Sequence, residues 1–588
     1  MARIAAVASV LIAVSARAAT LGVGTVRWGF DGKVVPGRIN VVSVEVVNPS
    51  PAPFDGLLRL YKDRGLGDRA GAPLVEPCFL SPGATRWVQF YPYVRNEYDR
   101  WFLDSEPGAG ERCELGKPKL GPPARVLLHD PEDPLGTGRD IRFPLFADPL
   151  FPPTVAATDG LDSVLLDHVP RWEPVKSQAF LDWVRRGGEL HLLHDRSGRY
   201  PVFGDELAVL NASQERQHVG AGLVLRHALS RREVSNEALA AKGCPPRRLI
   251  TASDYSGMND LEDPLLRALS SLTRPRHAWG LIYFTAIAYM VVLGPLNFVF
   301  GRKRRNYRLT LLFFLLSVAA AAAAMYGLGR RGHGEATAIH SLACARQIDA
   351  DTYDVTQWVS AFVTRGATYD ITHDAPHNLY SCCEDHEAIR GAIANGKDGV
   401  FRVDIPLYSH RGFLHRAKLK GHHVKLSVVR WRGSDRLEEL ALAPEPGFPD
   451  DVREMWAVHG DSQYRLTRQD GELRVVPHSA SAISQSSPDD ILPVWQRNWR
   501  HGWNAEDTET PPEEFLGRFW RVLMAREMGG TGSFHQEISR RPPDKDHVRV
   551  FLFARAPQGF EIKSDRFGKR LGFVLYCIDL FRPEDRNG

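Results

Sequence analysis

The sequence lacks most of the short motifs from which an enzymatic activity can be recognised. It has no C-x-x-C pair, so neither a thioredoxin-like redox site nor a zinc-ribbon pattern is supported. It has no G-x-x-x-x-G-K-[ST] loop, and we therefore expect no nucleotide as a partner. Cysteine is scarce, with seven residues at irregular spacing, an odd number that leaves one without a partner inside the chain. No pattern of residues therefore names a reaction.

A charge excess of either sign is also absent. Lys and Arg number 74 against 70 Asp and Glu, which leaves a net charge of +4. This balance argues against a nucleic-acid partner, because proteins that bind nucleic acids usually carry a clear basic excess. The densest basic cluster, residues 302–308, is better explained by membrane topology.

Asp, Glu, Lys, Arg and His are all missing from two stretches, residues 278–301 and 309–329. A helix needs about 20 apolar residues to cross the hydrocarbon core, so each stretch is long enough to span a bilayer once. We expect a two-helix transmembrane hairpin whose partner is the lipid bilayer. Asn297 is expected to pack the hairpin by bonding to the neighbouring helix or to carbonyls freed by Pro295.

The orientation of the hairpin follows from charge. The loop 302–308 carries five basic and no acidic side chains, which predicts that it is cytoplasmic. Residues 1–18 have a basic start, a short apolar core and an A-x-A site, which predict a secretion signal; an uncleaved anchor is the alternative. Both hypotheses place the flanking regions, before and after the hairpin, on the exported side.

The first exported region is predicted to be a β-sandwich. Residues 38–47 are rich in β-branched side chains and end at the turn-forming run Asn48 to Pro51. Residues 56–61 and 85–91 supply further alternating strands. An immunoglobulin-like sandwich over residues 24–145 is the simplest architecture.

The pattern changes near residue 150. Two short apolar runs, residues 163–166 and 189–193, flank a predicted helix over 173–186, which makes a βαβ unit with parallel strands. We expect a doubly wound α/β domain over 150–232, followed by a linker with helical character over 233–277.

Several segments of this region carry a resemblance to a known group of proteins. They are Leu161 to Leu166, the helix end Trp183 to Gly188, Val219 to Val224, and Gly294 to Phe298 followed by Arg302 to Arg305. The chain resembles uncharacterised bacterial envelope membrane proteins that have an Ig-like domain, a degenerate class I glutamine amidotransferase-like domain and a G-P-L-N transmembrane hairpin. The resemblance covers about residues 30 to 330. It implies a two-pass protein of the bacterial inner (cytoplasmic) membrane, most of it on the periplasmic side.

Catalytic members of the amidotransferase class need a cysteine nucleophile inside a G-x-C-x-G elbow, and this sequence has none. Ligands of open α/β sheets nevertheless bind beyond the carboxyl ends of the parallel strands. Asp167 and His168 follow the first run, and His194 and Asp195 follow the second, so these four form a candidate pocket. The alternative is that the two aspartates only cap loops. His191, inside its strand, is interpreted as a core residue.

Residues 331–588 are predicted to be a β-rich region with one helix near 511–528. The whole chain is thus expected to be a multidomain α/β plus all-β membrane protein. His373, His377, Cys382 and His386 lie close together in sequence and are the candidates for a metal site, with Zn²⁺ as the ion. Their spacing matches no known zinc pattern, and a solvated loop is the alternative, so no cofactor is expected.

Two functional hypotheses remain from different classes. The first is a noncatalytic, membrane-anchored cell-envelope protein, a scaffold or binding module with envelope proteins as partners, and it is supported by the architecture. The second is an exported hydrolase, possibly metal-dependent, which would use the candidate pocket or the metal candidates. Intramembrane charge is absent, so transport has no support.

Overall fold

The structure, a computed structural model, describes most of the chain. It covers residues 21–582 except 64–68, 96, 107–111, 134–140, 245–261, 273–278, 304–306, 333–336, 383–387, 461, 478, 483–511, 529–544 and 564–565. The predicted secretion signal, residues 1–18, lies outside the described residues. The chain divides into two compact units: Met1–Leu249 with Asp385–Gly399, and Ile250–Glu384 with Val400–Gly588. Each unit is therefore built from two segments that are separated in the sequence.

The first part of unit 1 consists of antiparallel sheets, as the alternating sequence predicts. One sheet has the order β1 (Gly22–Trp28), β4 (Val42–Val47), β7 (Thr85–Phe90). Another contains β10 (Cys113–Glu114), β9 (Arg100–Glu106), β5 (Phe54–Asp63) and β6 (Arg69–Leu80). Two short pairs are β2 (Lys33–Val34) with β11 (Lys119–Leu120) and β3 (Arg38–Ile39) with β8 (Tyr93–Val94). A β-rich domain is thus present, while its immunoglobulin type stays a prediction.

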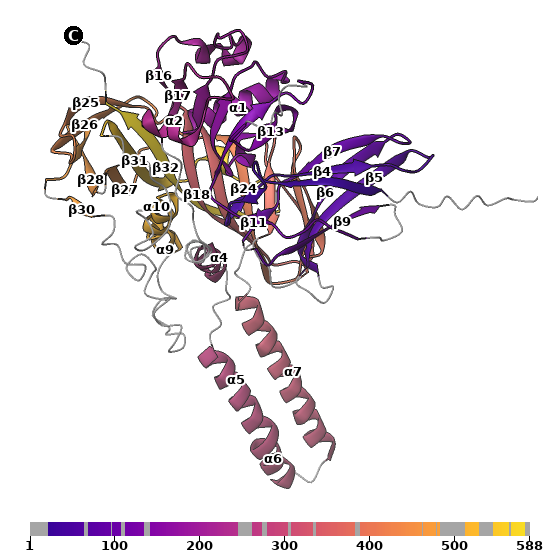
Figure 1. Ribbon diagram of the computed structural model, residues 1–588. Helices are drawn as coiled ribbons and strands as arrows, with labels where there is room; N and C mark the ends of the chain where they lie inside the picture. Colours follow the sequence, from indigo (N-terminus) through magenta and orange to yellow (C-terminus); the bar gives the residue numbers. More distant parts are fainter. Residues whose placement is uncertain are drawn as a thin grey trace, which may run out of the picture. The chain divides into compact units, whose positions relative to one another are not determined.

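The second part of unit 1 is a six-stranded, mainly parallel sheet (Figure 1). Its order is β13 (Leu145–Ala147), β12 (Ala124–His129), β14 (Leu161–Leu166), β15 (Glu189–Leu192), β17 (Gly222–Arg226), β16 (Arg216–Val219). Only β16 runs antiparallel to its neighbour. Helix α1 (Pro174–Arg185) connects β14 to β15, and α2 (Asn236–Ala241) follows β17. Three short 3₁₀ helices are Asp148–Leu150, Val155–Ala157 and Asp205–Asn211.

The parallel sheet begins earlier in the chain than the sequence pattern predicted. Strand β12 lies inside the region 24–145 that we assigned to the sandwich, yet it pairs in parallel with β14. The reason is visible in its burial, since Val126, Leu127 and Leu128 are all fully buried. A central parallel strand is covered on both faces and therefore shows a continuous apolar run.

A segment that follows the hairpin in sequence completes unit 1. Strand β22 (Gly391–Ala394) pairs in parallel with β6, with Ile393 opposite Leu74 and Ala394 opposite Val75. The amide of Ile389 also donates to the carbonyl of Gly71 at 3.1 Å. Ile393 is 1% exposed, so its side chain contributes to the core. The edge of the N-terminal sheet is therefore covered by chain that lies about 300 residues later in the sequence.

Unit 2 contains two helical spans that are long and apolar enough to cross a membrane, Gly280–Lys303 and Tyr307–Gly327. The first is built from α5 (Trp279–Val291), the π-helical turn Val292–Leu296 and α6 (Asn297–Lys303), and the second belongs to α7 (Tyr307–Gly332). The spans contact each other and extend as a hairpin (Figure 1). Their apolar side chains are exposed, among them Phe284, Met290, Leu312 and Leu316. An apolar surface of this kind is compatible with a lipid environment.

The remainder of unit 2 is dominated by a 12-stranded sheet. Its order is β21 (Leu379–Cys382), β24 (Ser409–Lys420), β19 (Thr352–Val363), β18 (Ala338–Asp349), β32 (Lys569–Phe581), β31 (His547–Arg555), β27 (Glu454–His459), β28 (Ser462–Gln469), β29 (Glu472–Val475), β26 (Glu439–Pro444), β25 (Leu426–Arg432), with β30 (Ser481–Ala482) beside β28. Strands β20 (Ala367–Thr372) and β23 (Val400–Ile405) form a further pair. The predicted helix near 511–528 appears as two short helices, α9 (Pro512–Gly517) and α10 (Trp520–Glu527).

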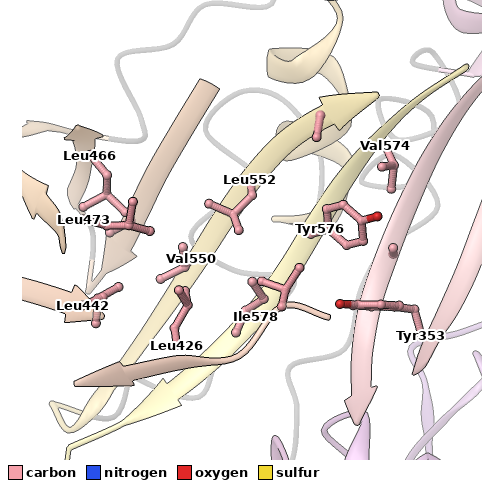
Figure 2. Packing of buried hydrophobic residues seen from close by; sticks show 14 of the residues in the cluster. Tyr353, Leu426, Leu442, Leu466, Leu473, Val550, Leu552, Val574, Tyr576 and Ile578 are labelled. Carbon is pink, nitrogen blue, oxygen red and sulfur yellow. The ribbon is translucent and has the colours of Figure 1, made fainter. Parts of the chain in front are cut away.

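The large sheet packs against itself. Side chains near its β25–β26 end, such as Leu426 and Leu442, belong to the same buried cluster as Tyr353 and Tyr576 on β19 and β32. Figure 2 shows Leu442, Leu466 and Leu473 on one side of this core, with Val550 and Leu552 across from them. A single strongly coiled sheet thus provides the two packed layers that a sandwich would otherwise supply.

Helix α4 (Glu262–Ser271), which precedes the hairpin, also belongs to the fold of unit 2. It packs on β18, β19 and β24, and its side chains Leu265 and Leu269 are fully buried. These three strands all follow the hairpin. In both units, therefore, segments from before and after the apolar helices share one core, which requires the two flanks of the hairpin to lie on the same side of it.

We predict that Ile393→Ala destabilises unit 1 although Ile393 follows the hairpin in sequence. Removing a fully buried isoleucine side chain costs about 2–5 kcal/mol. Proteolysis of full-length protein in a urea series, with peptides from residues 21–249 quantified by mass spectrometry, measures this loss. Val202→Ala is the control, because Val202 lies in unit 1 and is 77% exposed. Equal urea midpoints for the two variants would contradict the β6–β22 pairing.

Candidate functional site

The candidate pocket lies at the carboxyl edge of the parallel sheet. Asp167 and His168 directly follow β14, and His194 and Asp195 follow β15. The amide of His194 donates to the carbonyl of Leu229, a residue that follows β17. Residues from three neighbouring strands thus meet at this edge, as parallel topology requires.

Asp167 is held by a bidentate ion pair. The Nε and Nη2 atoms of Arg231 donate to its two carboxylate oxygens at 2.5 and 2.6 Å. Burial opposes ionisation of Asp167, but the hydrogen bonds from His168 and Arg231 and the charge of Arg231 lower its pKa below the usual value. Asp167 is thus an ionised, buried carboxylate with a fixed orientation rather than a loop cap.

His168 lies between two carboxylates. Its Nδ1 atom is 3.1 Å from Asp167 and its Nε2 atom is 3.4 Å from Asp148. Burial lowers the pKa of His168, but the hydrogen bonds and charges of Asp148 and Asp167 outweigh burial and raise the pKa to about 9. The imidazole is therefore protonated at neutral pH, and a protonated ring with both nitrogens engaged cannot act as a general base.

Asp195 caps the loop that follows β15, as the alternative hypothesis expected. Its Oδ1 atom accepts hydrogen bonds from the amides of Ser197 and Arg199 at 2.8 and 2.9 Å and from the Ser197 hydroxyl at 2.7 Å. These bonds close the loop that follows β15. The ring of His194 packs edge-on against Tyr200, with 4.6 Å between the ring centroids.

Asp133 connects Arg231, which follows β17, to the loop that follows β15. Asp133 pairs with Arg196, which follows Asp195, and lies 3.8 Å from Arg231. Asp167 and His168 therefore belong to one network of alternating charges, which does not include the side chains of His194 and Asp195. In this network the carboxylates and cations satisfy one another, which favours a stable surface over a reactive one.

The metal candidates of the C-terminal region lie elsewhere, in unit 2. His373 uses both ring nitrogens on backbone groups: Nδ1 accepts from the amide of Ala375 at 3.0 Å and Nε2 lies 3.1 Å from the carbonyl oxygen of Gly559. His377 adopts a positive φ of 58°, and Cys382 ends β21. His386 lies outside the described residues. The described contacts thus give His373 a structural role.

The predicted packing residues of the membrane hairpin sit at an irregular turn. Pro295 lies inside the π-helical segment Val292–Leu296, and Asn297 begins α6. A proline removes one backbone donor and often accompanies such a local widening. The Oδ1 atom of Asn297 is enclosed and makes no hydrogen bond with any described residue.

Sequence reasoning missed a buried polar cluster on one face of the parallel sheet. Glu189 and His191 on β15, His227 after β17 and Cys244 after α2 are all under 9% exposed. The Nδ1 atom of His191 lies 2.9 Å from Nε2 of His227, and its Nε2 atom lies 2.9 Å from Oε1 of Glu189. The spacing of Glu189 and His191, two residues apart on a strand, was the available signal, because it puts both on one face.

Comparisons with known proteins add no family and no function. No family model matches the sequence, and none of the curated proteins matches it. Among solved structures, an alkylpurine DNA glycosylase from Pseudomonas fluorescens bound to DNA containing an abasic site analogue is 13% identical, with a TM-score of 0.14, over 17% of this chain and 31% of that chain. A cycloisomaltooligosaccharide glucanotransferase from Paenibacillus sp., complexed with cycloisomaltoheptaose, is 9% identical, with a TM-score of 0.17. That match covers 78% of this chain and 98% of the glucanotransferase chain.

We predict that His168→Gln destabilises the protein at pH 6 and has much less effect at pH 10. The folded-state pKa of about 9 lies above the usual 6.5, so the stabilisation is fully present below pH 6.5 and is lost as the pH rises through about 9. The expected loss at pH 6 is about 2–3 kcal/mol. Urea denaturation of full-length protein at both pH values measures it.

His194→Gln is the comparison variant, because the ring of His194 packs on Tyr200 instead of lying between two carboxylates. Its effect should be smaller and should vary less with pH. A His168→Gln deficit of the same size at pH 6 and pH 10 would show that the ring is neutral in the folded protein.

Proposed function

We propose that this protein is a noncatalytic, membrane-anchored scaffold or binding module of the bacterial cell envelope. The observation that carries the proposal is the shared construction of the two units. Strand β22 pairs with β6 in unit 1, and α4 packs on strands that follow the hairpin in unit 2. The hairpin therefore serves to hold a large folded assembly at one membrane surface.

The side of the membrane is inferred from charge. Five basic side chains lie in the hairpin tip, residues 302–308, and short basic loops remain in the cytoplasm. The predicted secretion signal supports the same orientation. Both units then face the periplasm of the inner membrane, where envelope proteins are the partners that this surface would contact.

A binding role is supported more strongly than a hydrolytic one. The candidate pocket contains a charged network in which Asp167 is bound by Arg231 and His168 by two carboxylates. The sequence lacks the cysteine elbow of catalytic amidotransferases. A rigid, charge-compensated edge suits the recognition of a partner of fixed shape rather than proton transfer.

Site-specific proteolysis tests this topology. A protease recognition sequence is inserted into the full chain at three places: at the exposed residues Gly32 in unit 1 and Gly471 in unit 2, and between Lys303 and Tyr307 in the predicted cytoplasmic loop. In spheroplasts, externally added protease should cut the first two insertions and leave the third intact. In inverted membrane vesicles the pattern should be the reverse.

The possible cleavage patterns test the hairpin topology and the exported location separately. Cleavage of the Gly32 and Gly471 insertions from opposite sides of the membrane would overturn the hairpin topology itself. Cleavage of both only from the cytoplasmic side would keep the hairpin but refute the exported location and the envelope role.

A further inference from the structure

The buried polar cluster of unit 1 has the composition of a metal site. Glu189, His191 and Cys244 each direct one ligand atom into a common space, with these atoms within 4.8 Å of one another. All three residues are buried, His191 completely. The ligand atoms are a carboxylate oxygen, an imidazole nitrogen and a thiol sulfur, a set that suits zinc better than magnesium or calcium.

The sheet itself brings these residues together. Glu189 and His191 lie on the same face of β15, and Ser163 and Leu165 are their partners on β14. The other end of this face is apolar, with Leu127, Leu165, Leu193 and Leu225 in one cluster that also includes Cys244. Cys244 is carried over the face by α2, and its amide bonds to the carbonyl of Leu239. The cluster is thus a small group of buried polar side chains at the edge of an apolar core.

The hydrogen bonding of His191 fits a ligand. Its Nε2 atom is buried and makes no hydrogen bond with any described residue, although it lies 2.9 Å from Oε1 of Glu189. The Nδ1 atom lies 2.9 Å from Nε2 of His227. When Nδ1–H donates to His227, the Nε2 lone pair is directed away from that bond and toward Glu189. Metal-bound histidines are commonly oriented by such an outer hydrogen bond.

A zinc ion at this position would take the carboxylate, the neutral imidazole and the thiolate as ligands. Binding of Zn²⁺ would replace the thiol proton, which is released to solvent, and would leave Cys244 as a thiolate. The ion's two positive charges would then be balanced by Glu189 and Cys244.

The neighbouring fixed charges must also be counted. Arg125 approaches from β12, where its Nε donates to Ser163 at 2.7 Å and its Nη1 to the carbonyl of Cys244 at 3.3 Å. Asp162 on β14 acts on His191 with the opposite sign. Arg216 acts on Cys244 and Lys242 acts on His227 as further cations, so cations outnumber Asp162 around the cluster. The charges of Glu189 and of a Cys244 thiolate would therefore have to hold the ion.

We propose that Glu189, His191 and Cys244 form a buried zinc site that fastens α2 and the segment ending at Cys244 to the parallel sheet, with His227 as the outer partner of His191. Three protein ligands leave a fourth coordination position. Zinc with carboxylate, imidazole and thiolate has ligand distances of about 2.0–2.3 Å, so the ligand atoms would sit about 3.3–3.6 Å apart. This site does not depend on the proposed envelope function.

The experiment uses full-length protein purified in detergent with a tag that contains no histidine. Elemental analysis of the reduced protein is expected to give about one zinc per chain. Exchange of zinc for cobalt is expected to give the near-ultraviolet absorption of a cobalt–thiolate bond. This spectrum needs no variant, so it remains decisive even if substitutions at the site prevent folding.

Cys244→Ser and His191→Asn should each reduce the zinc content at least fivefold, and Cys244→Ser should abolish the thiolate absorption. Cys113→Ser is the matched control, because Cys113 is another free cysteine of unit 1, and it should retain both signals. Reduced protein that takes up no zinc or cobalt after reconstitution would overturn the proposal. So would a metal whose binding is unchanged in Cys244→Ser.

Discussion

The pairing of β22 with β6 is the constraint on which the rest of the architecture depends. A parallel pair fixes the position of both strands to within one residue, because a shift by one would turn Ile393 out of the core. Between these strands the chain passes through the α/β sheet, the apolar hairpin and part of the large sheet. All of these elements must therefore fit between two points that are held about 5 Å apart. Only an even number of membrane crossings would satisfy this condition, and the hairpin has two spans that are long and apolar enough to cross.

Each of the two units contains a buried charged side chain that is paired with side chains of opposite charge. In unit 1, Asp167 is compensated by Arg231 and His168. In unit 2, Arg416 binds both carboxylate oxygens of Asp354 at 2.7 and 2.8 Å, with both side chains at most 3% exposed. Removing one member of such a pair costs more than the pair contributes, since the remaining charge stays buried. These pairs therefore fix the register of their strands more than they raise stability.

The local elements were predictable from the sequence because their signals are local. Helix α1 was expected over 173–186 and spans Pro174–Arg185, and the two apolar spans were found where their composition placed them. The assignment of β12 failed, because an apolar strand at a domain boundary looks the same in a sandwich and in a parallel sheet. The pairings of β22 with β6 and of β18 with β32 were out of reach, since strand partners far apart in sequence leave no periodic trace.

The candidate site was predictable only in part. The rule for parallel sheets located Asp167, His168, His194 and Asp195 at one edge, but it gave no indication of Arg231, which together with His168 keeps Asp167 ionised. His191 was recognised as a core residue, whereas His227 and Cys244 come to it from 36 and 53 residues further along the chain. Three-dimensional proximity of this kind needs the fold before it can be seen.

The interleaved units also set an order for biosynthesis. Residues 21–249 leave the ribosome long before β22, so their second sheet has an open edge at β6 until the hairpin and the strands that precede β22 have been made. The large sheet is completed later still. Its strand β18, the first after the hairpin, pairs with β32, which lies near the end of the described chain. Completion of both units therefore waits for synthesis of the chain beyond the hairpin. A chain that ends before β22 would expose two unfinished sheet edges, at β6 and at β18, which is a direct route to aggregation and degradation.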